Sequence, residues 1–324
     1  MKELKVAVIG VGYLGRQHVR IYSEMDSVEL VAVVDKNPDT AQSVAREFHT
    51  TALTNHSEVL GKVDAVSLAV PTTEHCRIGC HLLEQGINVL VEKPIASSVE
   101  EAEALIRSAK LHERILQVGH LERFNPAVIE ARKIARQPLF FEVHRLGVFT
   151  SRSLDIDVVF DLMIHDLDVV LDLVGSPVKS VSAVGLPILS RKIDIANARI
   201  EFMNGCVANL TASRVSTEKV RKLRFFQPNE YVSLDYSRQD LVVLSVNQNQ
   251  PGQPPGFISR KIETRRIEPL KAEIESFLKV VRIEGQPEVA AESSKLALEL
   301  AQQVVEKIRA HSQALPREAL KING

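Results

Sequence analysis

The first fifteen residues, 1–15, read MKELKVAVIGVGYLG and decide the fold. An apolar run over 4–9 is typical of a buried strand, and Gly10, Gly12 and Gly15 follow it as G-x-G-x-x-G. The first glycine permits a tight turn from strand to helix, the second lets the backbone approach a pyrophosphate, and the third lets the helix pack closely. The phosphates would lie over the free N–H groups at the positive end of that helix. The pattern therefore predicts a dinucleotide site.

A second apolar run over 28–34 ends in Asp35, about 20 residues beyond the last glycine, where an acid that binds the ribose is expected. Such a carboxylate accepts hydrogen bonds from the adenosine ribose hydroxyls and repels a 2′-phosphate, so we expect NAD rather than NADP. Lys36 weakens that preference. The alternative is a plain βαβ unit in which the glycines serve packing and Asp35 caps a turn. The predicted cofactor-binding residues here are Gly10, Gly12, Tyr13, Leu14, Gly15, Asp35 and Lys36.

The composition is that of an ordinary globular protein. The 324 residues exceed what one core usually covers, which predicts two domains. A net charge of −1 argues against nucleic acid as the main partner, and no apolar run approaches the roughly 18 residues that span a bilayer. The 3 cysteines suggest no disulfide framework, and the N-terminus carries no small-residue cleavage site. We therefore expect a cytoplasmic enzyme.

Strand and helix patterns alternate up to about residue 120, which predicts a parallel, doubly wound sheet. Asn37 is expected to cap one helix, and Ser97 with Glu100 reads as a capping box before a helix over 98–112. The later part is richer in strands and predicts an α+β domain with an open, mostly antiparallel sheet. Its expected strands cover 143–149, 178–188, 196–203, 206–213, 221–227, 230–236 and 240–246, and its helices 161–174, 269–283 and 288–312. We assign 1–120 to the first domain and 121–324 to the second, with the C-terminal helix free to pack back on the first.

Two polar groups follow neighbouring strands at the edge where ligands bind in such sheets. Val70, Pro71 and Thr72, with His75, are expected to contact the cofactor; the alternative is a proline turn and a helix cap. Glu92, Lys93 and Pro94 end the next strand. Lys93 is positioned to exchange a proton with a substrate hydroxyl, because partial burial beside a positive nicotinamide lowers a lysine pKa. The alternative is a surface lysine paired with Glu92.

A third group lies on an apolar helix, where Asp161 and His165 are four residues apart and share a face. A carboxylate that orients a histidine is the arrangement of a general base. The alternatives are a helix cap with a buried histidine, or two ligands of a metal site that lacks the others. His75-Cys76 and Cys80-His81 also resemble paired zinc ligands, but no second group follows at the right spacing. We expect no metal.

These motifs resemble the family named after glucose–fructose oxidoreductase, inositol 2-dehydrogenase and the rhizopine-catabolism protein (Gfo/Idh/MocA). The matching segments are GVGYLGRQH at 10–18, VPTTEH at 70–75, VEKPIA at 91–96 and DLMIHDLD at 161–168. The resemblance implies a Rossmann domain, a dimer or tetramer formed through the open sheet, and hydride transfer at a sugar or polyol carbinol. It implies that Lys93 and His165 contact the reacting hydroxyl, that Asp161 orients His165, and that the Lys93–Pro94 bond is cis.

HLERFNPA at 120–127 resembles the members that oxidise C3 of UDP-N-acetylglucosamine-type sugars. Those members supply a 3-keto sugar to an aminotransferase, for 3-amino sugars in lipid A (lipopolysaccharide) or surface polysaccharide. Guanidinium groups suit a diphosphate because they bind phosphate oxygens in pairs. The substrate-binding candidates are Arg123, Phe124, Asn125, Arg145, Arg152 and Arg214. Three alternatives stay open: an inositol or free-sugar dehydrogenase, an NAD-dependent glycosidase, and a non-catalytic NAD-sensing regulator.

Overall fold

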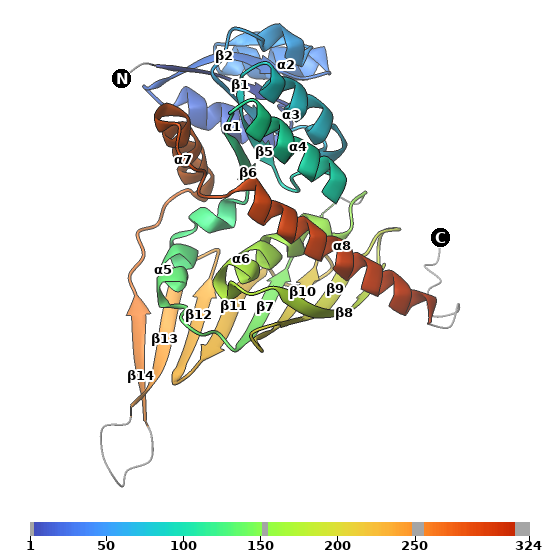
Figure 1. Cartoon of the computed structure of the whole chain (residues 1–324), viewed down its shortest axis with the longest axis vertical. Coiled ribbons are helices and arrows are strands. Elements are labelled where there is room, and N and C mark those ends of the chain that lie inside the picture. Colours follow the sequence, from blue (N-terminus) through green and yellow to red (C-terminus); the bar gives the residue numbers. More distant parts are fainter. Residues whose placement is uncertain (1–2, 151–154, 248–255, 315–324) are drawn as a thin grey trace. The chain divides into compact units, whose positions relative to one another are not determined.

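The computed structural model describes residues 3–150, 155–247 and 256–314 (Figure 1). The chain forms two compact units. The first contains the chain up to Leu121 and returns for Glu268–Leu296, and the second contains Glu122–Ile267 and the chain from Ala297 onward.

The first unit is built on a parallel six-stranded sheet with strand order β3-β2-β1-β4-β5-β6. This is the order of a dinucleotide-binding Rossmann fold, with the switch point between β1 and β4. The central strands are apolar on both faces, as expected of a sheet covered by helices on each side. The strands are β1 (Leu4–Ile9), β2 (Val28–Val34), β3 (Thr51–Leu53), β4 (Ala65–Leu68), β5 (Asn88–Glu92) and β6 (Leu116–Gly119).

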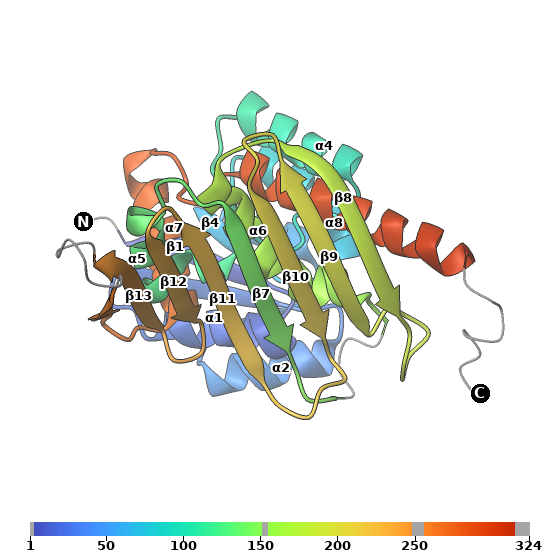
Figure 2. The same ribbon diagram turned by 90° about the horizontal axis from the view of Figure 1, so that it is seen from below.

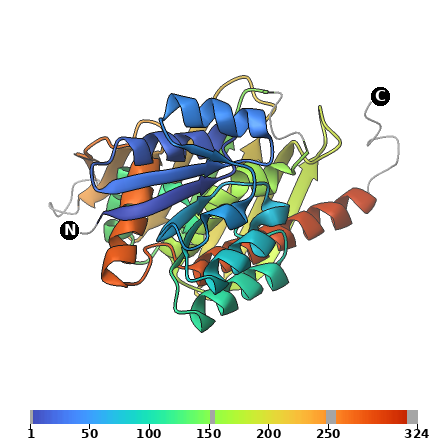
Figure 3. The same cartoon turned by 90° about the horizontal axis from the view of Figure 1, so that it is seen from above.

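Helices lie on both sides of this sheet (Figure 3). They are α1 (Tyr13–Ser23), α2 (Pro38–Glu47), α3 (His75–Glu84), α4 (Val99–Leu111) and α7 (Pro269–Ile283), with short 3₁₀ turns η1 (His56–Val59) and η2 (Thr72–Glu74). Asn37 caps α2, as expected, because its side chain accepts hydrogen bonds from two backbone N–H groups. The cap of α4 is Ser98, one residue later than expected: its hydroxyl accepts from the N–H of Glu101, whose carboxylate accepts from the N–H of Ser97.

Helix α7 belongs to the first unit, although the sequence interpretation placed it in the second domain with the rest of 121–324. Its apolar stripe explains the difference. Leu270, Ile274 and Phe277 are buried in the same cluster as Val6 and Val8 of β1. The sequence predicts the helix and its apolar stripe, but it does not indicate which sheet the stripe packs against.

The second unit is built on an eight-stranded sheet with order β14-β13-β12-β11-β7-β10-β9-β8 (Figure 2). All neighbours are antiparallel except β7 and β10, which are parallel. The strand expected over 143–149 starts three residues earlier, and β14 was not expected. The strands are β7 (Phe140–Leu146), β8 (Val178–Leu186), β9 (Ile195–Phe202), β10 (Val207–Ser213), β11 (Val220–Gln227), β12 (Glu230–Asp235), β13 (Asp240–Asn247) and β14 (Gly256–Ile262).

Helices pack on one face of this sheet and bury its core. Met163, Leu167 and Val304 lie in one cluster with Leu210 and Leu223 of the strands. The helical elements are η3 (Leu121–Phe124), α5 (Pro126–Ile134), the π-helical turn η4 (Val159–Met163), α6 (Ile164–Val174) and α8 (Ala291–Gln313), whose first residues belong to the first unit. Within the described ranges, no helix combines the length and the apolar character that crossing a membrane requires.

Candidate active site

The glycine loop leaves open space where a cofactor would approach. A Cβ atom built on Gly12 has no other heavy atom within 4 Å, whereas one built on Gly15 lies 1.8 Å from the carbonyl oxygen of Gly10. Gly12 is the N-cap of α1. Because it has no side chain, it cannot accept a hydrogen bond from the first N–H groups of that helix. The loop therefore packs tightly against the sheet and presents bare backbone outward.

Asp35 is held in place beside this loop. One of its carboxylate oxygens accepts from the N–H of Val11 at 3.0 Å, and the other accepts from the N–H of Asn37 at 2.9 Å. A carboxylate offers about four acceptor positions, so two remain for ribose hydroxyls. A hollow of about 680 Å³ adjoins the loop and is lined by Gly12, Tyr13, Arg16, Asp39, Thr40 and neighbouring residues of α1 and α2. Tyr13 is exposed at its rim and Lys36 is exposed on the surface. The open backbone, the fixed carboxylate and the hollow fit a dinucleotide.

Val70, Pro71 and Thr72 follow β4 at the same edge, and His75 pins this edge to the next strand. The ring nitrogens of His75 lie 3.0 Å from the carbonyl oxygen of Val70 and 2.9 Å from that of Pro94. Burial lowers the pKa of His75, against the effect of these carbonyls, and so favours the neutral ring. A neutral ring donates to only one of the two carbonyls. These contacts give His75 a role in positioning the turn that carries Lys93; the Lys93–Pro94 bond is cis, as expected.

Behind Lys93 lies a buried chain of hydrogen bonds that sequence reasoning missed. His18 lies 3.0 Å from both Glu92 Oε1 and Ser67 Oγ, and Ser67 Oγ lies 2.8 Å from the hydroxyl of Tyr22. Every group is satisfied when Tyr22 donates to Ser67, Ser67 to His18, and His18 to the carboxylate. The only available signal was His18 within GVGYLGRQH, since its partners are far away in sequence.

The chain of hydrogen bonds through His18 keeps Glu92 ionised beside Lys93. Burial alone would raise the pKa of Glu92, but the hydrogen bond from His18 and the charge of Lys93 hold it below its usual range. Glu273 of α7 shows the opposite behaviour. Burial, and then the negative charge of Glu92, raise its pKa well above the usual range, and its carboxyl oxygens have no hydrogen-bond partner among the described residues. Lys93 is half-buried and stands in the chain between the anionic Glu92 and the uncharged Pro94.

In the second unit, Asp161 lies in η4 and His165 in the first turn of α6. The sequence predicts one continuous α-helix here. The structure has a wider π turn, in which the N–H of Ile164 donates to the carbonyl of Val159, five residues earlier. Such turns are frequent at functional sites. Asp161 and His165 are both half-buried, so they lie at the margin of the core.

An ion-pair cluster fixes the start of α6 next to His165. Asp166 accepts from Nε and Nη2 of Arg145 at 2.6 and 2.9 Å, and Glu122 accepts from Nη1 at 3.0 Å. Arg145 is 1% exposed and its guanidinium lies 4.9 Å from the ring centre of Tyr236. Burial would lower its pKa, but the two carboxylates raise it above the usual value. Arg145 therefore holds β7 to α6 instead of presenting its charge to a ligand.

The segment around Arg123 is also occupied by contacts within the fold. Arg123 Nε donates to Asp168 at 2.6 Å, and a second carboxylate, that of Asp172, pairs with Nη1. Phe124 is buried, and Asn125 caps α5 while its amide donates to the carbonyl of Tyr236. The geometry lends no support to these three residues as substrate contacts, and that interpretation stays a prediction.

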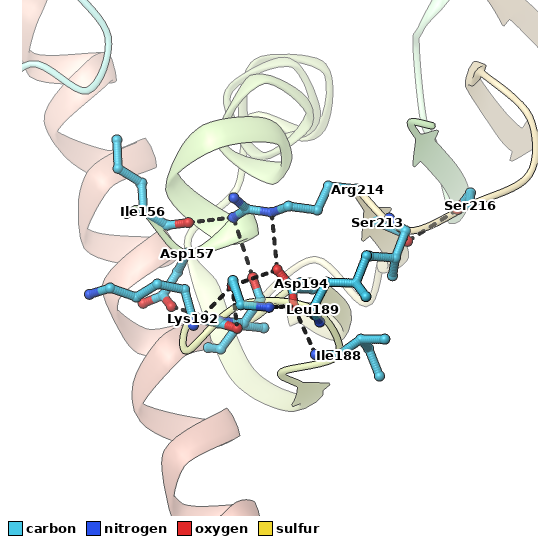
Figure 4. Close-up of polar contacts among 12 residues, drawn as sticks. Ile156, Asp157, Ile188, Leu189, Lys192, Asp194, Ser213, Arg214 and Ser216 are labelled. Atoms are coloured by element: carbon cyan, nitrogen blue, oxygen red, sulfur yellow. Dashed lines mark hydrogen bonds and ion pairs between the residues drawn. The ribbon is translucent and has the colours of Figure 1, made fainter. Parts of the chain in front are cut away.

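Arg214 fills a similar role at a nearby loop (Figure 4). Its guanidinium donates to the carbonyl oxygens of Ile156 and Ile193 and lies 3.6 Å from Asp194. Asp194 in turn accepts three backbone N–H groups, those of Ile188, Leu189 and Ser190. Arg152 lies outside the described residues. Within the described ranges, no three His, Cys, Asp or Glu side chains gather as a metal site would require.

Family models match both units. Residues 4–120 match the oxidoreductase family with an NAD-binding Rossmann fold, and residues 131–227 match the GFO/IDH/MocA C-terminal domain. UDP-N-acetylglucosamine 3-dehydrogenase from Acidithiobacillus ferrooxidans is 38% identical over 282 residues, which cover 87% of this chain and 90% of that enzyme.

The chain belongs to the Gfo/Idh/MocA family. Its membership confirms the predicted fold class, an NAD-binding Rossmann domain and an oxidoreductase activity. The solved structure of the same Acidithiobacillus ferrooxidans enzyme superposes with a TM-score of 0.89 at 35% identity and covers 96% of this chain and 99% of that one.

Other similar proteins are named for activities on other molecules. A scyllo-inositol 2-dehydrogenase (NAD(+)) from Bacillus subtilis is 30% identical over 66% of this chain and 68% of that enzyme. The structure of an aldose-aldose oxidoreductase from Caulobacter crescentus has a TM-score of 0.82 at 20% identity, over 96% of this chain and 98% of that one, and supports the fold alone.

Proposed function

We propose that this protein is an NAD-dependent dehydrogenase that oxidises the C3 carbinol of UDP-N-acetylglucosamine or a closely related nucleotide sugar. The observation that carries the proposal is its likeness to UDP-N-acetylglucosamine 3-dehydrogenase, which extends over 87% of this chain and 90% of that enzyme. An inositol dehydrogenase, the main alternative, is supported by a match over 66% of this chain. The greater length and identity of the first match favour the nucleotide sugar.

Different residues bind the cofactor and transfer the proton in this proposal. Backbone N–H groups at the glycine loop would hold the pyrophosphate of NAD, and Asp35 its adenosine ribose. Bound NAD supplies the acceptor for the hydride that leaves the carbinol carbon. Lys93 and His165 contact the reacting hydroxyl, and one of them takes its proton as the alcohol becomes a ketone. Asp161 orients His165.

Ionised Glu92 and the half-burial of Lys93 act on this lysine in opposite directions. An anionic neighbour favours the protonated lysine, and partial burial with a bound positive nicotinamide opposes it. We further propose that the product, a 3-keto sugar, is passed to an aminotransferase, that the protein is a homodimer or homotetramer, and that it serves polysaccharide or lipopolysaccharide synthesis in the cytoplasm.

The test mixes the purified protein with NAD and UDP-N-acetylglucosamine, and adds glutamate with a sugar aminotransferase to remove the ketone. Nicotinamide absorbance is followed, with myo-inositol, scyllo-inositol and free hexoses in parallel wells. We expect NADH only with the nucleotide sugar. A signal only with a polyol or free sugar contradicts the proposed substrate and leaves the dehydrogenase.

Two further results would replace the proposal. Release of a monosaccharide without net NADH indicates the NAD-dependent glycosidase. Silence in every well, with NAD binding shown by calorimetry, indicates the NAD-sensing regulator.

A further inference from the structure

Three arginines gather at one end of the helix-covered face of the second unit's sheet. Arg145 on β7, Arg221 on β11 and Arg214 just beyond β10 each continue the alternating row of side chains that forms the buried core. In the sheet register Arg145 lies directly opposite Arg221 on one side and Ala212 on the other, two residues before Arg214. We call Arg145, Arg214 and Arg221 the arginine end.

Two members of the arginine end are committed to the fold. Arg145 is bonded to Asp166 and Glu122, and Arg214 to backbone carbonyls and, at longer range, to Asp194. Both are almost fully buried. Arg145 therefore holds α6 in place, and Arg214 holds the loop before β9.

Arg221 differs from both. It is half-buried, and among the residues that the structure describes no carboxylate lies within ion-pair distance of its guanidinium. Burial, and then the positive charge of Arg145, lower its pKa, and the more distant Glu122, Asp166 and Asp161 only partly oppose this. The protein thus holds a cation where its charge is unfavourable, which is the arrangement of a site that gains stability when an anion arrives.

We propose that Arg221 binds a phosphate oxygen of the diphosphate in the substrate, an inference that rests on the proposed function. A guanidinium fits phosphate because its planar N–H groups donate in pairs, and it is weakly hydrated, so partial burial costs it less than it costs a lysine. It lies directly opposite Arg145, whose partner Asp166 is the residue after His165. The diphosphate role that the sequence suggests for Arg123, Arg145 and Arg214 belongs, on this reasoning, to Arg221.

The test compares Arg221→Gln and Arg221→Lys with Arg224→Gln. Arg224 lies on the same strand, three residues along and on the opposite face, so the control removes an equal charge. We expect Arg221→Gln to raise KM for UDP-N-acetylglucosamine and Kd for UDP by about 10–100-fold, with kcat within about threefold, because a charge-assisted hydrogen bond is lost. Arg221→Lys should recover part of the affinity, and Arg224→Gln should match the wild type.

A separate readout distinguishes failure of this inference from failure of the proposed function. If the wild type oxidises UDP-N-acetylglucosamine and Arg221→Gln keeps its KM and its Kd for UDP, the inference is wrong and the function stands. If the wild type does not oxidise that sugar, calorimetry of the NAD-bound protein with inorganic pyrophosphate decides. Binding that disappears in Arg221→Gln supports the anion site, and absent or unchanged binding overturns it.

Discussion

The glycine loop of the first unit and the arginine end of the second, the two places where we propose that phosphates bind, are built in opposite ways. At the glycine loop the protein provides neutral backbone, with open space at Gly12 and few side chains. At the arginine end it provides guanidinium groups, two of which are already bonded within the fold: Arg145 to Asp166 and Glu122, and Arg214 to backbone carbonyls. The comparison teaches that the two regions need different criteria for a binding residue. At the glycine loop the criterion is open space beside the backbone, as at Gly12. At the arginine end it is a guanidinium without a carboxylate partner among the described residues, as at Arg221.

The largest effect is expected where the reaction itself is tested. Lys93→Met and His165→Ala should each lower kcat by about 10²–10⁴-fold, the contribution of a positioned acid or base, while the Kd for NAD stays close to the wild type. Steady-state rates and calorimetry measure the two quantities. Lys279→Met, at an exposed position of α7, is the control. Wild-type rates in both Lys93 and His165 variants would remove the proposed site.

The contrast within the arginine end predicts the next largest effect, on stability. Arg145→Gln leaves Asp166 and Glu122 as buried charges without their partner and should lower the free energy of unfolding by about 3–5 kcal/mol. Arg221→Gln removes a charge with no counter-ion and should change it by less than about 1 kcal/mol. Urea titrations of both variants check this. Equal losses would show that Arg221 is also part of the fold's own ion pairs.

The glycine loop predicts a similar division between fold and binding. Gly15→Ala should cost about 1–3 kcal/mol, because the new Cβ meets a backbone oxygen that cannot move freely. Gly12→Ala should leave the melting temperature unchanged, since its Cβ enters open space, but raise the Kd for NAD by about 10-fold. Thermal melts without NAD, paired with NAD calorimetry, separate the two. Unchanged NAD affinity in Gly12→Ala would contradict a pyrophosphate at this loop.

The smallest effect concerns Glu273 and depends on pH. Its pKa is raised in the folded protein, so its contribution to stability is full below the unfolded pKa, about 4.3, and is lost as pH rises toward the folded value. Glu273→Gln does not titrate and should therefore raise the melting temperature by about 2–4 °C at pH 8, and by less at pH 5. Glu275→Gln, exposed on the same helix, is the control. A gain that is equal at both pH values would contradict the buried, protonated carboxyl.

Features that depend on neighbouring residues could be predicted from the sequence. The glycine loop, the Asn37 cap and the bounds of α7 follow from short-range patterns, and the structure reproduces them. Ser98 in place of Ser97 shows the limit of such patterns, since two adjacent serines offer the same cap. The strand β14 was missed because its neighbouring run of proline and glycine, at 251–256, reads as a loop.

Features that depend on distant pairs could not be predicted. Glu92 meets His18 across 74 residues of chain, and Gln117 donates to the carbonyl of Glu273 across 156. The residues next to each arginine in the sequence do not reveal its partners. Sequence alone therefore did not separate Arg145, which is paired with carboxylates, from Arg221, which has no carboxylate partner among the described residues. Strand ends and helix spacing indicated Lys93, Asp161 and His165 as catalytic candidates, the family's motifs strengthened that choice, and their roles stay a prediction.

The return of α7 to the first unit has a consequence for biosynthesis. Leu270, Ile274 and Phe277 complete the apolar cluster around β1, so the cofactor-binding unit cannot complete its core until residues 269–283 have been synthesised. The parallel strands, which are synthesised earlier, therefore lack part of their apolar cover while the antiparallel sheet is made. We expect a nascent chain that ends near residue 260 to expose the apolar residues that α7 covers, and therefore to bind chaperones more readily than a chain that includes α7.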